Sequence, residues 1–266
     1  MSKKIGILDS GVGGLSVLKE VVERKIYDEV YFLGDTKYFP YGIKKVEFIQ
    51  ERVSEIVEFF TRLDIGEIII ACNTASAVAY DYLLDKFKDY DIKIYSIILS
   101  AIDGIKNTNW KKMGVLATRR TKESKIYPTL INKFVSQDIE VYVKSCSEGP
   151  LLETIENGII DGEIIINELK KCIDPLIDKD IDGLVLGCTH LPFIKPVIER
   201  LYPQIPIIDP SQEILRILSK EDLANPIVKV YTTGDSVGFE RILNKLLNVG
   251  WKVEQVEIER SEMIAK

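Results

Sequence analysis

Short apolar runs alternate with longer amphipathic stretches along almost the whole chain, and this alternation constrains the fold more than any other feature. Several runs are nearly continuous in isoleucine, valine and leucine, which is typical of strands that are buried on both faces. Strands that alternate with helices favour an α/β fold with mainly parallel sheets flanked by helices. The predicted strands are Lys4–Leu8, Glu29–Leu33, Glu67–Ala71, Ile92–Ile98, Met113–Ala117, Ile139–Val143, Gly183–Gly187, Ile205–Ile208 and Ile227–Thr232, and the clearest helices are Ser16–Arg24, Lys45–Arg62 and Ile164–Asp178.

Two pairs of segments resemble each other and occur in the same order, which indicates an internal repeat. Lys4–Ser10 resembles Lys112–Thr118, since each reads as a buried strand that ends in a small hydroxyl residue. Ile69–Thr74 resembles Val185–Thr189, and each of these strands is followed by a cysteine. We therefore expect two similar α/β domains that face each other, with the active site in the cleft between them. The expected first domain comprises residues 1–97 and 210–266, and the second comprises residues 98–209.

Charge and composition exclude several classes of protein. The 266 residues carry a formal net charge of −6, which argues against nucleic acid as a partner. No apolar run approaches the ~18 residues that a membrane span needs. The chain enters its first predicted strand almost at once, which leaves no room for a signal peptide, so we expect a cytoplasmic protein with free thiols. Of the four cysteines, Cys146 and Cys172 lie in or near amphipathic segments and are expected to be structural.

Polar side chains gather where the predicted strands end, and these positions predict the functional site. In open α/β sheets, ligands bind outside the carboxyl ends of the strands. Serine, threonine, aspartate and asparagine also cap helices, but five such clusters, two of which contain a cysteine, favour a shared site. The clusters are Asp9-Ser10, Gly34–Lys37, Cys72–Thr74, Thr118 with Thr121, and Cys188–His190.

The two cysteines that follow strands, Cys72 and Cys188, suit proton transfer better than the other roles of cysteine. A metal site is disfavoured because the chain has one histidine and no C-x-x-C motif. A disulfide is unusual in the cytosol, and a Cys-His hydrolase would use only one of the two thiols. Two thiols on opposite sides of a cleft can instead remove a proton from one face of a carbon and donate a proton to the other. Asp9 could accept the thiol proton of Cys72, and His190 could assist Cys188.

Seven motifs spread over nearly the whole chain resemble the sequence blocks of the glutamate racemases, in the aspartate/glutamate racemase family. They are Asp9–Gly14, Pro40–Gly42, Ala71–Ser76, Ala117-Thr118 with Thr121, Gly187–His190, Ile208–Ser211 and Tyr231–Gly234. The resemblance implies an enzyme that interconverts L-glutamate and D-glutamate by a two-base mechanism without a cofactor, and that supplies D-glutamate for peptidoglycan synthesis. We expect L- and D-glutamate as its ligands, no metal, and a homodimer.

The resemblance also assigns roles to individual residues. Cys72 matches the thiol that takes the α-proton from D-glutamate, and Cys188 matches the thiol that takes it from L-glutamate. Asp9 and His190 match the groups that assist these two thiols. The residues that match substrate contacts are Asp9, Ser10, Tyr41, Gly42, Asn73, Thr74, Thr118, Thr121, Thr189 and His190.

A third assisting group in the family is a glutamate upstream of the second cysteine. Glu156 fits it best, but Glu148 and Glu153 compete with it because Leu152–Ile155 departs from the usual family stretch. Two other functions stay open at the level of sequence. One is an aspartate, other amino-acid or hydantoin racemase of the same superfamily, although the Asn-Thr and Thr-His blocks favour glutamate. The other is a non-catalytic binding protein that retains the fold, and the two intact thiols argue against it.

Overall fold

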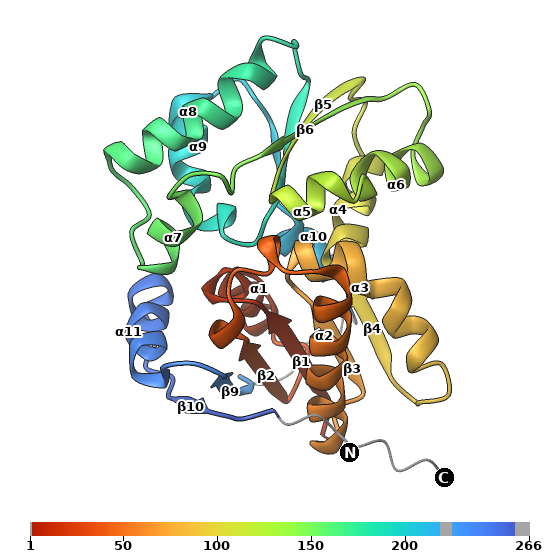
Figure 1. Ribbon diagram of the computed structural model, residues 1–266, viewed down its shortest axis with the longest axis vertical. Helices are drawn as coiled ribbons and strands as arrows, with labels where there is room; N and C mark the ends of the chain where they lie inside the picture. The colour runs from red at the N-terminus through yellow and green to blue at the C-terminus, as the bar shows by residue number, and fades with distance from the viewer. Residues whose placement is uncertain (1, 219–224, 259–266) are drawn as a thin grey trace.

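The computed structural model describes residues 2–218 and 225–258, which form two parallel sheets, one above the other in Figure 1. The strands of the larger sheet are β1 (Lys4–Asp9), β2 (Glu29–Gly34), β3 (Glu67–Ile70), β4 (Lys93–Ser96), β9 (Ile227–Thr232) and β10 (Val253–Gln255), in the order β10-β9-β2-β1-β3-β4. The smaller sheet contains β5 (Lys112–Ala117), β6 (Glu140–Ser145), β7 (Gly183–Gly187) and β8 (Ile207–Ile208), in the order β6-β5-β7-β8. Every strand pair in the described residues is parallel, which confirms the predicted α/β fold.

Helices follow most strands and cover the sheets (Figure 1). Along the chain they are α1 (Leu15–Arg24), α2 (Val46–Arg62), α3 (Asn73–Lys86), α4 (Ile97–Lys106), α5 (Arg119–Glu123), α6 (Ile126–Phe134), α7 (Leu151–Glu156), α8 (Glu163–Ile177), α9 (Lys195–Leu201), α10 (Pro210–Glu213) and α11 (Ser236–Leu247). Short 3-10 helices span Val12–Gly14, Thr36–Tyr38, Tyr41–Ile43, Leu191–Ile194 and Ile214–Arg216. Within the described ranges, each helix is too short or too polar to span a bilayer.

The apolar runs are nearly continuous because both faces of the larger sheet are buried. Ile5 and Ile7 of β1 pack with α1 in one core cluster, whereas Leu8 packs with α2 and α3 in another. Successive side chains of a strand point to opposite faces, so a strand between two helical layers needs apolar residues at nearly every position. A third cluster fills the space between the smaller sheet and α8.

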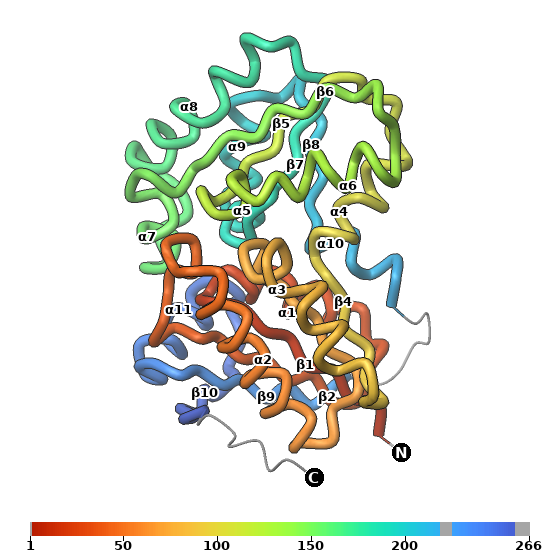
Figure 2. The backbone as a smooth tube through the Cα atoms, turned by 45° about the vertical axis from the view of Figure 1, so that its right-hand side comes forward, coloured from red at the N-terminus to blue at the C-terminus, as the bar shows by residue number. Residues whose placement is uncertain are grey.

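The chain passes between the two sheets at two places that lie side by side. It leaves the larger sheet after β4 through α4, and it returns after β8 through α10 (Figure 2). The two crossings contact each other, and the Ser100 hydroxyl donates to the Pro210 carbonyl at 3.1 Å. This packing sets how the carboxyl ends of the two sheets face each other.

The structure differs from the predicted elements at several points, and the predicted strand Ile205–Ile208 is reduced to Ile207–Ile208. The predicted strand Ile92–Ile98 ends earlier, because Ile97 already begins α4. The buried residues of α4 recur with helical spacing, so its first apolar residues continue the run without belonging to the strand. The short edge strand β10 was not predicted, since it is partly exposed and polar. Residues 1, 219–224 and 259–266 of the predicted first domain lie outside the described residues.

Candidate active site

The carboxyl ends of β1, β3, β5 and β7 converge on one cavity between the two sheets. Cys72 follows β3 of the larger sheet, and Cys188 follows β7 of the smaller sheet, so each sheet contributes one thiol. The two side chains are 5% and 6% exposed. The cavity is lined by Ser10, Phe39, Pro40, Tyr41, Gly42, Cys72, Asn73, Thr74, Thr118, Leu152, Cys188, Thr189 and His190.

Three of the predicted site residues lie behind this lining and contact it. Asp9 is buried and accepts a hydrogen bond from the Thr189 hydroxyl at 3.0 Å. Thr121 lies behind Thr118, with 3.0 Å between their hydroxyl oxygens. Thr118 also accepts from the Thr121 backbone N–H, so it caps α5 as well as lining the cavity. Glu156 reaches the cavity through His190.

The Cys72 thiol is held in its protonated form by its surroundings. Burial, together with the negative charge of Asp9, raises the pKa of Cys72 to about 12. The thiol donates a hydrogen bond to the Ser10 hydroxyl, with 3.6 Å between sulfur and oxygen. Burial raises the pKa of Asp9 to about 6, while His190 and the Gly11 N–H act in the opposite direction. At neutral pH, Asp9 is therefore mainly a carboxylate, and its negative charge acts on the Cys72 thiol.

The Cys188 thiol lies beside an imidazolium. The Sγ of Cys188 is 3.7 Å from Nδ1 of His190, and Nε2 of His190 is 2.6 Å from a carboxylate oxygen of Glu156. Burial alone would lower the pKa of His190, but Cys188 and Glu156 outweigh it and raise that pKa well above its ordinary value. A neighbouring cation stabilises the thiolate form of a cysteine. The two thiols therefore differ in their neighbours, since the negative charge of Asp9 acts on Cys72 and His190 lies beside Cys188.

The structure distinguishes the three candidate glutamates. Glu156 ends α7 and accepts both from His190 and from the Val12 N–H at 2.8 Å. Glu148 instead forms an ion pair of 3.7 Å with Arg119, and Glu153 is exposed on α7. Of the three, Glu156 is therefore the one that the fold brings to the second thiol.

The cluster at Gly34–Lys37 does not join the cavity, contrary to the expectation of a site shared by five clusters. The Asp35 carboxylate is fully buried and pairs with Arg52 through two hydrogen bonds of 2.8 and 2.9 Å. It also accepts from the Tyr41 hydroxyl at 2.6 Å. Through this contact, Asp35 anchors the segment that carries Tyr41 and Gly42. The sequence did not indicate Arg52 as its partner.

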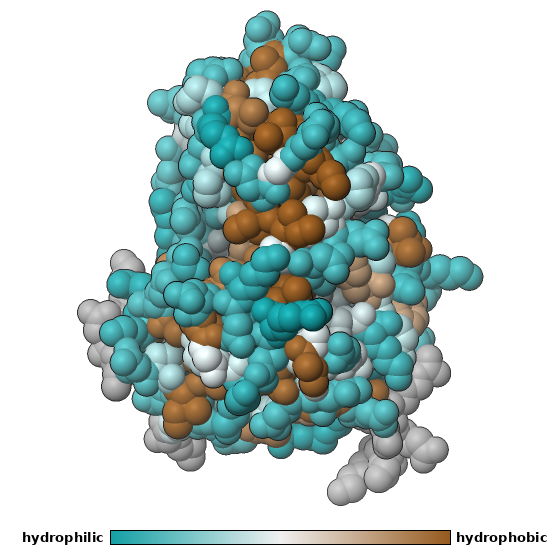
Figure 3. Space-filling view, turned by 90° about the vertical axis from the view of Figure 1, so that its left-hand side faces the viewer, coloured by the Kyte–Doolittle hydropathy of each residue, from teal (hydrophilic) through white to brown (hydrophobic). Residues whose placement is uncertain are grey.

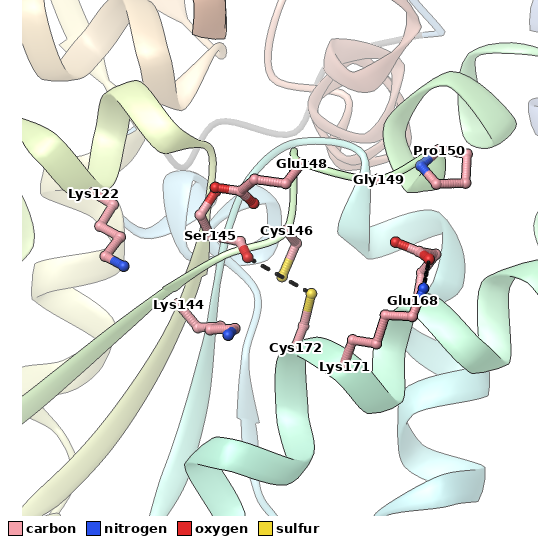
Figure 4. Close-up of a pocket in the computed structure, with 10 residues that line it drawn as sticks. All are labelled: Lys122, Lys144, Ser145, Cys146, Glu148, Gly149, Pro150, Glu168, Lys171 and Cys172. Carbon is pink, nitrogen blue, oxygen red and sulfur yellow. Dashed lines mark hydrogen bonds and ion pairs between the residues drawn. The ribbon is translucent and has the colours of Figure 1, made fainter.

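Cys146 and Cys172 point toward each other in a separate cavity beside β6 and α8 (Figure 4). This cavity encloses about 390 Å³, and neither cysteine lines the cavity that contains Cys72 and Cys188. The Cys172 thiol donates to the Ser145 carbonyl, with 3.8 Å between sulfur and oxygen. Burial and the adjacent Cys172 raise the pKa of Cys146 well above its ordinary value, so it stays a neutral thiol. The placement agrees with a structural role for both.

Comparisons with known proteins agree with this geometry. The family model described as Asp/Glu/Hydantoin racemase matches residues 9–218. The glutamate racemase of Thermoanaerobacter pseudethanolicus is 37% identical over 265 residues, which cover 96% of each chain. The crystal structure of a Bacillus anthracis glutamate racemase isoform superposes with a TM-score of 0.87 at 31% identity, covering 96% of this chain and 98% of that one. The Francisella tularensis glutamate racemase, solved in complex with D-glutamate, superposes with a TM-score of 0.84 at 29% identity, covering 97% and 98%. The chain therefore belongs to the Asp/Glu/Hydantoin racemase family.

Proposed function

We propose that this protein is a glutamate racemase that moves the α-proton between two cysteine thiols without a cofactor. The observation that carries the proposal is the pair of thiols, Cys72 and Cys188, which reach one cavity from opposite sheets. Each has its own assisting group, Asp9 on one side and His190 on the other. The named function of the relatives, which match nearly the whole chain, supports glutamate as the substrate.

In the direction from L-glutamate to D-glutamate, the Cys188 thiolate takes the α-proton and the Cys72 thiol donates its own proton to the opposite face. His190, whose Nδ1 lies 3.7 Å from the Cys188 sulfur, assists this transfer. In the reverse direction, Asp9 accepts the proton of Cys72 as the Cys72 sulfur takes the α-proton of D-glutamate, and Cys188, assisted by His190, donates a proton to the opposite face. The high pKa of Cys72 supports such assistance, because few molecules would carry a Cys72 thiolate at neutral pH.

Besides proton transfer by the thiols, the reaction requires that the carbanion formed at the α-carbon be stabilised. A positioned acid or base contributes roughly 10²–10⁴-fold, which is too little to labilise the α-proton of an amino acid. Helix α3 begins at Asn73 with its N-terminus at the cavity, and N–H groups of its first turn can bind the substrate carboxylate. The hydroxyls of Thr74, Thr118 and Thr189 lie around the same space. Such preorganised donors stabilise the charge that develops in the transition state.

Glutamate can enter only if the cleft widens. The cavity encloses about 20 Å³, which is room for about one water molecule. Hydrogen bonds across the cleft hold it closed, since Thr189 donates to Asp9 and the hydroxyl oxygens of Thr74 and Thr118 are 2.9 Å apart. We propose that these hydroxyls exchange their partners for the substrate as it binds.

The path of the proton tests the two-base proposal. In D₂O, the reaction of pure L-glutamate is expected to give D-glutamate that carries deuterium at Cα. The abstracted proton stays on Cys188, whereas the delivered hydron comes from Cys72, which has exchanged with solvent. The remaining L-glutamate should stay protiated while conversion is below about a tenth, where reverse flux is small. Chiral separation followed by mass spectrometry measures both enantiomers. Similar deuterium contents in the two at that stage would indicate a single base and overturn the proposal.

Glu156→Gln is expected to lower kcat/KM about tenfold, because a charge-assisted hydrogen bond to His190 is lost. The pKa of His190 should also fall, because Glu156 raises it in the wild type. The imidazolium should then lose its proton at a lower pH, and the alkaline limb of the pH–rate profile should move to lower pH. Polarimetric assays between pH 6 and 10 would measure both effects. Glu153→Gln changes the same helix at an exposed position and should have wild-type kinetics. Equal kinetics in the two variants would contradict the role of Glu156.

We also propose two domains, 1–97 with 210–266 and 98–209, because the chain passes between the sheets after β4 and after β8.

A homodimer is supported by apolar side chains on the face that carries α7, α8 and α11 (Figure 3). Ile159 and Ile160, between α7 and α8, and Ile164 on α8 are 46%, 38% and 55% exposed. The free thiols support a cytoplasmic enzyme that supplies D-glutamate for peptidoglycan synthesis.

A further inference from the structure

Tyr127 of α6 connects the two halves of the site from a position behind the cavity. Its side chain is fully buried, and its hydroxyl donates to the amide oxygen of Asn73 at 2.8 Å. Asn73 directly follows Cys72 and begins α3. On the other side, the Tyr127 ring packs against Gly187, where a Cβ atom would lie 3.2 Å from a ring carbon. Gly187 directly precedes Cys188, so one tyrosine contacts the neighbours of both thiols.

The contact with Tyr127 decides which end of the Asn73 amide is available to a ligand. A side-chain amide has an oxygen that accepts hydrogen bonds and an NH₂ group that donates them. Tyr127 occupies the oxygen, whereas within residues 2–218 and 225–258 the NH₂ group has no acceptor. Asn73 is 2% exposed and lines the cavity. The NH₂ group is therefore the part of this side chain that remains for a bound molecule.

The orientation of this amide matters for an anionic substrate. An NH₂ group facing a carboxylate donates to a charged acceptor, which gives one of the stronger hydrogen bonds in proteins. If the amide turned over, its oxygen would face the carboxylate and repel it. Tyr127 opposes this, because its buried hydroxyl donates to the Asn73 amide oxygen and would lose that acceptor if the amide turned over.

We propose that Tyr127 is a positioning residue that holds the Asn73 amide with its NH₂ group toward a carboxylate of glutamate. The inference rests on the proposed function, since it assumes that glutamate occupies the cavity. Tyr127 does not touch the reacting atoms and acts only through Asn73. It also links the two sides of the cleft, since α6 lies between two strands of the smaller sheet in the chain and Asn73 follows a strand of the larger one.

The test compares two fully buried tyrosines. Tyr127→Phe should raise KM about tenfold for both enantiomers and leave kcat within about threefold, because binding of a carboxylate is weakened equally in the ground state and the transition state. Tyr27→Phe removes a hydroxyl that is equally buried but donates to Glu67, outside the cavity. The Tyr27→Phe protein should have the KM of the wild type. Its melting temperature measures how much stability is lost with a buried hydroxyl. A KM change of the same size in both variants would overturn the proposal.

A double-mutant cycle tests whether Tyr127 acts through Asn73. In an Asn73→Ala background, Tyr127→Phe should have no further effect on KM, since there is no amide left to orient. Additive effects of the two substitutions would show that Tyr127 acts by another route. If Tyr127→Phe does not fold, Asn73→Asp carries the test: it keeps an oxygen for Tyr127 but replaces the donor that faces the substrate. KM should then rise at least tenfold, and a wild-type KM would refute the assigned orientation.

Failure of the proposed function is recognised separately in the same experiments. The wild-type protein is assayed first with each pure enantiomer, and absence of racemisation there would refute the function itself. Where the wild type is active, the equilibrium constant of one for a racemisation requires kcat/KM to be equal in the two directions. Each variant should therefore lose the same fraction of kcat/KM with L-glutamate and with D-glutamate. Titration calorimetry with D-glutamate gives the change in affinity independently of turnover.

Discussion

Replacement of either Cys72 or Cys188 by alanine is expected to reduce racemisation by a factor of about 10²–10⁴ or more. Each face of the α-carbon needs its own proton carrier, and the two thiols reach the cavity from different sheets. In the proposed mechanism, one thiol cannot replace the other, because Asp9 assists Cys72 and His190 assists Cys188. Initial rates from each pure enantiomer, followed by chiral chromatography, measure the loss.

Cys146→Ala and Cys172→Ala are matched controls, since these thiols are also buried but belong to the separate cavity beside α8. Both controls should keep turnover within a few-fold of the wild type. Circular dichroism of all four variants checks that the fold is retained. Substantial activity in a folded Cys188→Ala protein would rule out the two-base mechanism, even if the protein proved to be a glutamate racemase.

Gly13→Ala is expected to lower kcat/KM about 100-fold while the protein remains folded. A Cβ atom at Gly13 would lie 2.4 Å from the Thr189 hydroxyl oxygen and 2.6 Å from Nδ1 of His190. Neither side chain can move freely, because Thr189 is bonded to Asp9 and His190 to Glu156. The added methyl group must therefore displace the cleft walls, and displacements of about 1 Å in an active site can cost about 10²-fold in rate.

Gly66→Ala provides the control for this substitution. A Cβ atom there would meet only the Asp91 carbonyl oxygen at 3.6 Å, which is an ordinary contact. The kinetics of the Gly66→Ala protein should therefore match those of the wild type. The free energy of unfolding of the Gly13→Ala protein should fall by about 1–3 kcal/mol, the usual cost of overpacking a well-packed region. Wild-type kinetics in Gly13→Ala would mean that the cleft is more open in solution than in this structure, and would contradict the prediction.

The sequence alone determined the parallel sheets and the positions of the two thiols that line the cavity. Both follow from local patterns. Nearly continuous apolar runs require strands covered on two faces, as Ile7 and Leu8 of β1 illustrate by packing into different clusters. A cysteine directly after such a strand, as at Cys72 and Cys188, must lie at the carboxyl edge of its sheet. The substrate, by contrast, came from the resemblance and from the relatives, since spacing alone does not name glutamate.

Only the tertiary structure decided which side chains meet across the cleft. Glu148, Glu153 and Glu156 lie close together in the sequence, and although the resemblance favours Glu156, only the fold shows which of them reaches His190. The sequence did not predict a role for Tyr127, because an isolated aromatic residue in a helix is typical of the hydrophobic core. Contacts of this kind depend on how one sheet is placed against the other. The packing of α4 against α10, where the chain crosses between the sheets, determines that placement. Periodicity encodes which face of an element is buried, but it carries no information about the distance between elements that belong to different sheets.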